Sequence, residues 1–447
     1  MVTLTWHHIV IFVLTFFSYS AFFTCRKAFS NIKDTWGKTF SPQDITNPLY
    51  PKKIWEKEQL FITSGDANVF LAELDSIFMF AYTIGLFFSG MIGDRVNLRY
   101  MLSFGMCSSA ILTFLFGYIS EVIHMENLLY YRCIYFLNGL CQSSSLPASL
   151  AVLGNWFSKS SSGIVFGLWG ANDSLGNIIG SLIVVSSLDF GYEYGMLLNS
   201  MLLFCGGIIV FFCLLPHPNE VGLKNPDDMY VVRDKSNHKA INFFTALMLP
   251  RVMLYALSFA CLKMVTYSLQ FWLPTYLTQG LNWDDDTSDE FSSLYDFGAI
   301  LGGALLGAIT DYMTFRSPVI YISVLFSPMI LYIFANVGNH YTANAVVMVT
   351  IGIFLGGPAN TISTVVTADL GKHEQMKDNT KALATVSGII DGTGSLGVAI
   401  GQYLAVVEIS SQAIQRQPMF SIWAGLSMKQ KPKIEESSST ASDPKHN

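Results

Sequence analysis

GMIGDRVNLR, at residues 90–99, is the stretch that decides the fold, because a second copy, GAITDYMTFR, stands at 307–316. Each copy reads GxxxD and carries an Arg five positions after the Asp. The charged residues of the two copies are Asp94, Arg95 and Arg99, and then Asp311 and Arg316. A motif that recurs at matching positions predicts a chain built from two similar halves.

Long stretches without Asp, Glu, Lys or Arg surround both copies. The chain has 447 residues, of which 51% are hydrophobic and 13% are charged, whereas a soluble domain carries about 25% charged residues. Because a membrane-spanning helix needs roughly 20 apolar residues, we predict an all-α polytopic membrane protein. The eleven predicted spans are 7–28, 72–93, 100–120, 129–153, 163–187, 194–216, 251–277, 292–312, 317–337, 342–368 and 382–407.

A polar linker separates six spans from five. We expect an N-terminal six-helix lobe at 1–216 with a non-cytoplasmic loop at 29–70, a cytoplasmic linker at 217–250, a C-terminal lobe at 251–408, and a polar, disordered tail at 409–447. A complete pair of six-helix repeats needs a twelfth span, and no sufficiently apolar run follows residue 408.

A second pair of matched segments supports the duplication: SLG at 174–176 and SLG at 395–397. Parallel repeats of this kind place a binding site near the membrane midplane, between the lobes. The loops after even-numbered spans hold twelve Lys and Arg residues, while the short loops on the other side hold only Arg132. Since positive charge marks the cytosolic side, we expect a cytosolic N-terminus.

Arg26 and Lys27 directly follow an apolar run that begins at Ile9. A cation at membrane depth is by default a functional-site candidate, and the planar fork of Arg matches phosphate oxygens two at a time. Lys27 also fits a side chain that reaches back to the interface. For Lys263, two interpretations stay open: a ligand contact, or the ion-pair partner of an acidic neighbour.

The duplicated loop resembles the loop motif of the major facilitator superfamily. That resemblance implies a gating role, in which Asp94 and Arg99 pair in one conformation and separate in the other. In the second copy, Asp311 and Arg316 would form a weaker latch, because Tyr312 stands where the first copy has Arg95.

Further stretches resemble the sugar-phosphate exchangers (solute carrier family 37), which are relatives of the bacterial glycerol-phosphate and hexose-phosphate antiporters. These stretches are FFSY at 16–19, RK at 26–27, GDRVNLR at 93–99, GNWF at 154–157, GIVFGLW at 163–169, FWLPTYL at 271–277 and ADLG at 368–371. The resemblance runs from about residue 7 to about residue 407.

This resemblance implies a substrate site. Arg26 would bind the substrate phosphate, and Tyr82 and Asp296 would lie beside it. Thr266 stands where the bacterial carriers have a second Arg, and Lys263 is placed to substitute for it. We therefore expect an antiporter that exchanges an organic (sugar) phosphate for inorganic phosphate by alternating access.

The expected partners are the phosphate ester, inorganic phosphate and membrane lipid; the sequence identifies no accessory membrane protein. A net charge of −6 without a basic stripe argues against nucleic-acid binding. We expect no enzyme activity, cofactor or metal, because the seven cysteines form no CxxC pair and the GxGxxG at 392–397 lies within a span. The endoplasmic reticulum membrane is the expected location, with the lysosomal membrane as the alternative.

Two other functions stay open at this point. One is a proton-coupled organic-anion carrier with Asp173, Asp296 or Asp391 as the relay. The other is a truncated, non-transporting isoform that serves as a membrane scaffold, which the missing span would favour.

Overall fold

Helices form wherever the sequence carries its apolar runs. A computed structural model describes residues 5–39, 64–123, 125, 127–157, 162–187, 190–223, 242–249, 251–281, 283, 285–313, 317–338, 340–371 and 382–412. Within these residues, nine helices are long and apolar enough to cross a membrane. The prediction of an all-α multi-pass membrane protein is therefore confirmed.

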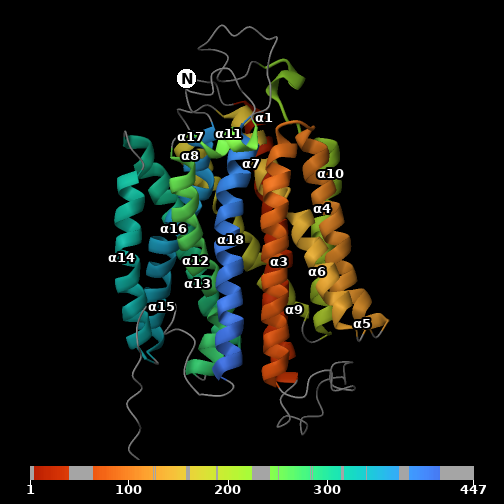
Figure 1. The fold of residues 1–447 in the computed structure, drawn as a ribbon, viewed down its shortest axis with the longest axis vertical. Helices are drawn as coiled ribbons and strands as arrows, with labels where there is room; N and C mark the ends of the chain where they lie inside the picture. Colours follow the sequence, from red (N-terminus) through yellow and green to blue (C-terminus); the bar gives the residue numbers. More distant parts are fainter. Residues whose placement is uncertain are drawn as a thin grey trace, which may run out of the picture.

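The helices run roughly parallel to one long axis (Figure 1). Their bounds are α1 (Trp6–Thr39), α3 (Ser64–Gly93), α4 (Leu98–Phe114), α5 (Ser120–Val122), α6 (Leu128–Gln142), α7 (Ser145–Trp156), α8 (Ser162–Trp169), α9 (Asn172–Ser187), α10 (Tyr192–Cys213), α11 (Phe243–Leu247), α12 (Val252–Leu281), α13 (Asp285–Tyr312), α14 (Ser317–Asn336), α15 (Tyr341–Ile351), α16 (Gly357–Thr361), α17 (Thr367–Gly371) and α18 (Leu383–Gln412). Short π-helical turns at Leu115–Ile119, Gly352–Gly356 and Ile362–Val366 continue α4 and connect α15, α16 and α17.

Two predicted spans are interrupted. The span predicted at 129–153 divides into α6 and α7, and the one at 163–187 divides into α8 and α9. At the first break, the hydroxyls of Ser143 and Ser144 donate to carbonyls three residues back, which competes with regular helix bonding. Pro147 follows and has no N–H to donate to the carbonyl of residue 143.

The predicted loop at 29–70 begins too early, because α1 continues past residue 28 to Thr39. The reason is packing: Phe29 and Ile32 are buried, and Lys33 forms an ion pair with Asp75 of α3. At the other end of the chain, α18 continues to Gln412. The remaining predicted tail, 413–447, lies outside the described residues, and the missing twelfth span stays a prediction.

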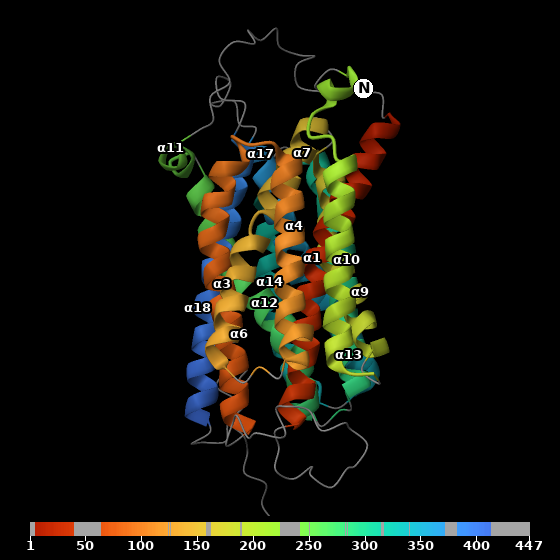
Figure 2. The same cartoon turned by 90° about the vertical axis from the view of Figure 1, so that its right-hand side faces the viewer.

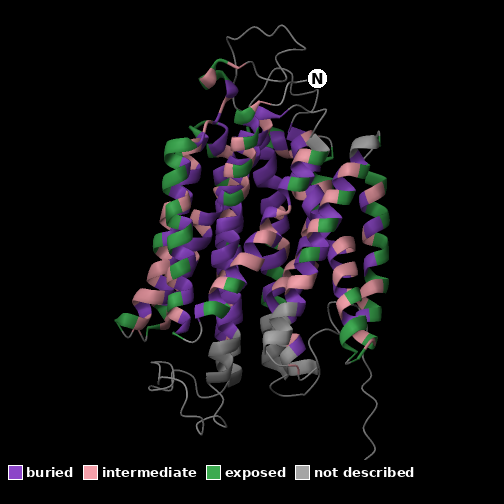
Figure 3. Cartoon of the chain, turned by 180° about the vertical axis from the view of Figure 1, so that it is seen from behind, coloured by how far each residue is buried: buried purple, intermediate pink, exposed green. Residues whose placement is uncertain are grey.

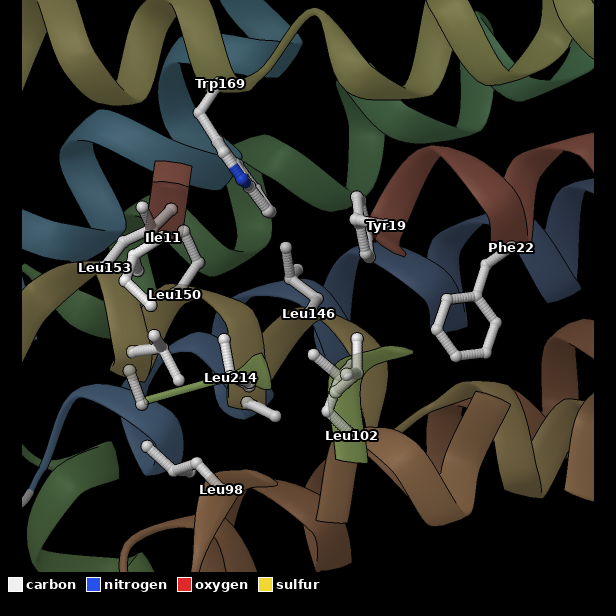
Figure 4. Packing of buried hydrophobic residues seen from close by; sticks show 14 of the residues in the cluster. Ile11, Tyr19, Phe22, Leu98, Leu102, Leu146, Leu150, Leu153, Trp169 and Leu214 are labelled. Atoms are coloured by element: carbon white, nitrogen blue, oxygen red, sulfur yellow. The ribbon is translucent and has the colours of Figure 1, made fainter. Parts of the chain in front are cut away.

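The two halves meet along two pairs of helices. Helix α3 packs against α18, and the two run side by side in both views (Figures 1 and 2). Helix α13 packs against α8 and α9. Exposed residues gather on the outward faces and buried ones in the interior (Figure 3). In one buried cluster, Trp169 and Tyr19 lie near leucines of α4 and α7 (Figure 4).

Glycines bring the backbones of the two halves together, as small residues do where helices pack in a membrane. A Cβ on Gly90 of α3 would lie 3.1 Å from the Cα of Gly388 in α18. A Cβ on Gly167 of α8 would lie 3.1 Å from the Cα of Gly307 in α13. Gly90 and Gly307 begin the two copies of the duplicated motif, and Gly167 and Gly388 each precede their copy of SLG by the same spacing. The same glycine–glycine contact between the halves therefore occurs twice, with the roles of the two repeats exchanged.

Candidate functional site

A small cavity lies between the two halves, midway along the bundle. Its volume is about 60 Å³, and one water needs roughly 10–15 Å³ of such space. Its wall comes from α1, α7, α8, α9, α12, α13, α16 and α18. The charged residues in the wall are Lys263, Asp173, Asp296 and Asp391. Charged side chains at this depth mark a functional-site candidate.

Helix α12 turns one face to the cavity. Lys263, Thr266, Tyr267 and Gln270 line it, and their spacing of three and four residues puts them on one side of a helix. The hydroxyl of Thr266 donates to the carbonyl of Lys263 at 3.1 Å, so it is committed within its own helix. Thr266 therefore lines the predicted site and offers its oxygen as an acceptor.

Lys263 is held by two partners from α18. Its Nζ lies 2.6 Å from Asp391 Oδ1, and it donates to Ser395 Oγ at 2.8 Å. The ring of Tyr267 lies beneath the same ammonium, with 5.1 Å from Nζ to the ring centroid. Of the two interpretations of Lys263, ion pairing with an acidic neighbour is the arrangement in this structure.

Arg26 of α1 is buried next to the cavity and lies outside the set of residues that line it. Its Nε donates to Gln142 Oε1 at 2.7 Å. The guanidinium carbon lies 4.5 Å from the ring centroid of Tyr82 and 4.7 Å from that of Phe23. Within the described part of the chain, neither terminal nitrogen of Arg26 makes a hydrogen bond of regular geometry, although the Tyr82 hydroxyl lies close enough to interact with the guanidinium. A buried guanidinium without an anionic partner is a site for an oxyanion.

Tyr82 of α3 connects the two cations. Arg26 lies over its ring, and the Nζ of Lys263 lies 5.8 Å from the same ring centroid. The Tyr82 hydroxyl points at Asp391 Oδ2 at 3.5 Å. The structure therefore brings Arg26, Tyr82 and Lys263, which the sequence predicted as site residues, into one cluster with Asp391.

Asp296 of α13 belongs to a second polar cluster in the cavity wall. Asn177 Nδ2 donates to Asp296 Oδ1 at 3.1 Å, and Gln270 Nε2 donates to Asn177 Oδ1 at 3.0 Å. Lys27 lies within electrostatic reach of the Asp296 carboxylate. Since Lys27 is buried, it does not reach the interface as an anchoring side chain would.

The gating residues lie at the end of the bundle where α3 finishes. Asp94 accepts hydrogen bonds from the backbone N–H of Ala384 and Thr385, at 3.2 and 2.9 Å, and from the Thr385 hydroxyl at 2.5 Å. It thereby satisfies free N–H groups at the N-terminus of α18. Arg99, its expected partner, instead pairs with Glu220 at 3.0 Å.

The three other residues predicted to gate are Arg95, Asp311 and Arg316. Arg95 is exposed and donates to the carbonyl of Met91 at 3.3 Å. The side chain of Asp311, and all of Arg316, lie outside the described residues. The charged side chains of only the first copy lie within the described residues, and there Arg99 pairs with Glu220 and Asp94 contacts the start of α18.

Sequence reasoning missed a cluster at the opposite end. Lys33 pairs with Asp75, and the rings of Phe271 and Trp272 lie 5.2 and 5.8 Å from its Nζ. The signal was available, since Lys33 follows Phe29 by four residues on the same helical face. All seven cysteines are free. Among the described residues, no group of three His, Cys, Asp or Glu side chains could hold a metal ion.

Comparisons with known proteins show the family of this chain. The sequence model described as "Major Facilitator Superfamily" matches residues 6–402. The chain is 44% identical to "Sugar phosphate exchanger 3" of Gallus gallus over 431 residues, covering 90% of this chain and 86% of the relative. It is 43% identical to the Homo sapiens protein of the same name, covering 89% and 86%. It is 32% identical to "Glucose-6-phosphate exchanger SLC37A2" of Danio rerio, covering 90% and 86%.

Solved structures share the fold. The proton:xylose symporter XylE, bound to 6-bromo-6-deoxy-D-glucose, superposes with a TM-score of 0.68 at 11% identity, over 94% of this chain and 92% of that one. The human organic anion transporter MFSD10 superposes with a TM-score of 0.59 at 13% identity, over 94% and 97%. At such identities the likeness concerns the fold alone.

Proposed function

Because the chain belongs to the major facilitator superfamily and, within it, to the sugar phosphate exchangers, we propose that it is a secondary carrier that exchanges a sugar phosphate for inorganic phosphate. The observation that carries this proposal is the buried guanidinium of Arg26, whose two terminal nitrogens are unpaired beside the central cavity. A phosphate group carries the charge and the paired oxygens that this fork takes up.

The unpaired fork also favours exchange over one-way transport. A buried cation without an anionic partner destabilises its conformation by several kcal/mol, and a bound phosphate removes that penalty. The loaded carrier therefore changes conformation more readily than the empty one. Lys263 adds no such penalty, because Asp391 already neutralises its ammonium.

In this carrier Arg26 binds the phosphate, with Tyr82 forming the wall of its site. Lys263 is the second anion contact once the phosphate replaces Asp391 on its Nζ. Thr266 offers its oxygen next to Lys263, and Asp296 contacts the rest of the ester. The protein catalyses no covalent step and uses no cofactor.

Alternating access opens the cavity to one side at a time. At one end, Asp94 bonded to the start of α18 keeps α3 and α18 together, and Arg99 exchanges Glu220 for Asp94 when that end opens. Asp311 and Arg316 form the corresponding latch of the second half. At the other end, Lys33 and its rings join α1 to α12.

The gate at Asp94 faces the cytosol, together with the N-terminus and the linker 217–250. This orientation follows from the excess of Lys and Arg on that side. The lobes are 1–216 and 251–408, and the membrane is that of the endoplasmic reticulum, with the lysosome as the alternative.

The test is transport by purified protein in liposomes. Vesicles loaded with inorganic phosphate should take up labelled glucose 6-phosphate, and vesicles without internal phosphate should not. Uptake that follows an imposed pH gradient without internal phosphate would instead indicate a proton-coupled carrier that uses Asp173, Asp296 or Asp391. Absence of any flux from a folded preparation would leave the scaffold function.

A further inference from the structure

The cavity has a polar wall that the anion-binding residues do not account for. Asn177 of α9, Gln270 of α12 and Asp296 of α13 are hydrogen-bonded in a row, at 3.0 and 3.1 Å. The row connects one helix of the first half to two helices of the second. Asn177 and Asp296 are buried, and the two hydrogen bonds join them to each other and to Gln270. We call these three residues the amide–carboxylate row.

Further polar atoms near the row lack partners. Within the described residues, Asn360 Nδ2, Asn172 Oδ1 and Trp169 Nε1 are buried and make no hydrogen bond, and all three residues line the same cavity. Leaving a buried donor or acceptor unsatisfied costs about 1–3 kcal/mol. Three such atoms around one cavity indicate a ligand that supplies both donors and acceptors.

The row and the cations occupy different parts of the cavity. Gln270 follows Lys263 by seven residues on the same face of α12, which is about 10 Å along a helix. Near Lys263, the Asp391 pair is neutral and Arg26 adds one positive charge. Near the row, the Asp296 carboxylate lies within electrostatic reach of Lys27, and Asp173 within that of Lys263. Two of the three carboxylates that line the cavity are thus those of Asp173 and Asp296 beside the row, while Arg26 lies next to the other end.

From this arrangement we propose that the amide–carboxylate row is the subsite for the hydroxyl groups of the transported ester. A hydroxyl both donates and accepts, so it matches the amides and the carboxylate of the row together with the free groups of Asn360 and Asn172. The carboxylates of Asp173 and Asp296 at that end disfavour a second anionic group. The carrier therefore selects phosphate esters with a neutral, hydroxyl-rich remainder over phosphate esters that carry a carboxylate. This inference rests on the proposed exchange function.

The experiment separates the row from the phosphate site. Native protein and the Asn177→Ala and Gln270→Ala variants are reconstituted, and exchange of labelled phosphate against internal phosphate is measured first. Inhibition of that exchange by glucose 6-phosphate and by 3-phosphoglycerate is then titrated. Each variant should need roughly three- to tenfold more glucose 6-phosphate for half inhibition, the loss expected for one hydrogen bond. Half-saturation by phosphate itself should stay within about twofold, since phosphate contacts only the other end.

A matched control is Asn199→Ala, which removes another fully buried amide, located in α10 and away from the cavity. Its inhibition by the ester should equal that of the native protein. Asp296→Asn should improve inhibition by 3-phosphoglycerate relative to glucose 6-phosphate. If both alanine variants weaken phosphate and ester equally, or leave the ester unchanged, the hydroxyl subsite is wrong. If native protein exchanges no phosphate at all, the proposed function itself fails, independently of the row.

Discussion

Replacing Arg26 with Lys tests the phosphate site directly, because it keeps the charge and removes the fork. The native side chain uses Nε on Gln142 and leaves two terminal nitrogens for the ligand. A lysine ammonium can donate to one phosphate oxygen, and it cannot keep the hydrogen bond to Gln142 at the same time. The variant should therefore lose one charge-assisted hydrogen bond, worth about 1.5–3 kcal/mol.

That loss corresponds to a roughly 10- to 150-fold weaker affinity for phosphate. The assay is half-saturation of phosphate exchange in liposomes at fixed pH and ionic strength, accompanied by thermal stability in detergent. Arg132→Lys is the matched control, because Arg132 pairs with Glu73 at the protein surface at 2.9 Å and should change affinity by less than twofold. If Arg26→Lys retains native affinity within about threefold, Arg26 does not bind the phosphate as a fork.

Two further perturbations address the contacts around the cavity. Asp391→Asn leaves the Lys263 ammonium without its carboxylate, so the free energy of unfolding of the empty protein should fall by about 3–5 kcal/mol. Phosphate should then raise the melting temperature of this variant more than that of the native protein. An equal effect of phosphate on both proteins would contradict the role of Lys263 as an anion contact. Asp94→Ala removes the acceptor for the backbone N–H groups of Ala384 and Thr385. Hydrogen–deuterium exchange at the start of α18 should therefore accelerate at least tenfold. Unchanged protection of these amides would show that Asp94 does not hold that end closed.

The membrane helices could be predicted because apolar length is a local property of the sequence. The breaks in the fourth and fifth predicted spans could not, because Ser143 and Gly170 are also common in unbroken membrane helices. The early end assigned to α1 had a similar cause: Lys33 looks like a loop residue until Asp75 is known to lie beside it.

The residues of the candidate site could be predicted from the sequence, but the contacts between them could not. Arg26 and Lys263 stood out because charge inside an apolar run is rare. That Asp391 pairs with Lys263, or that Asp94 contacts the start of α18, depends on the approach of helices hundreds of residues apart. The sequence carries no local signal for such contacts.

The paired glycines at the two junctions between the halves make each junction a smooth contact between helix backbones. Where Gly90 faces Gly388 and Gly167 faces Gly307, the backbones of the facing helices come into close contact, and at these two points no glycine side chain hinders one helix from sliding past the other. The two contacts occupy equivalent positions of the duplicated sequence. A larger residue at either place would meet the facing backbone and push the two halves apart.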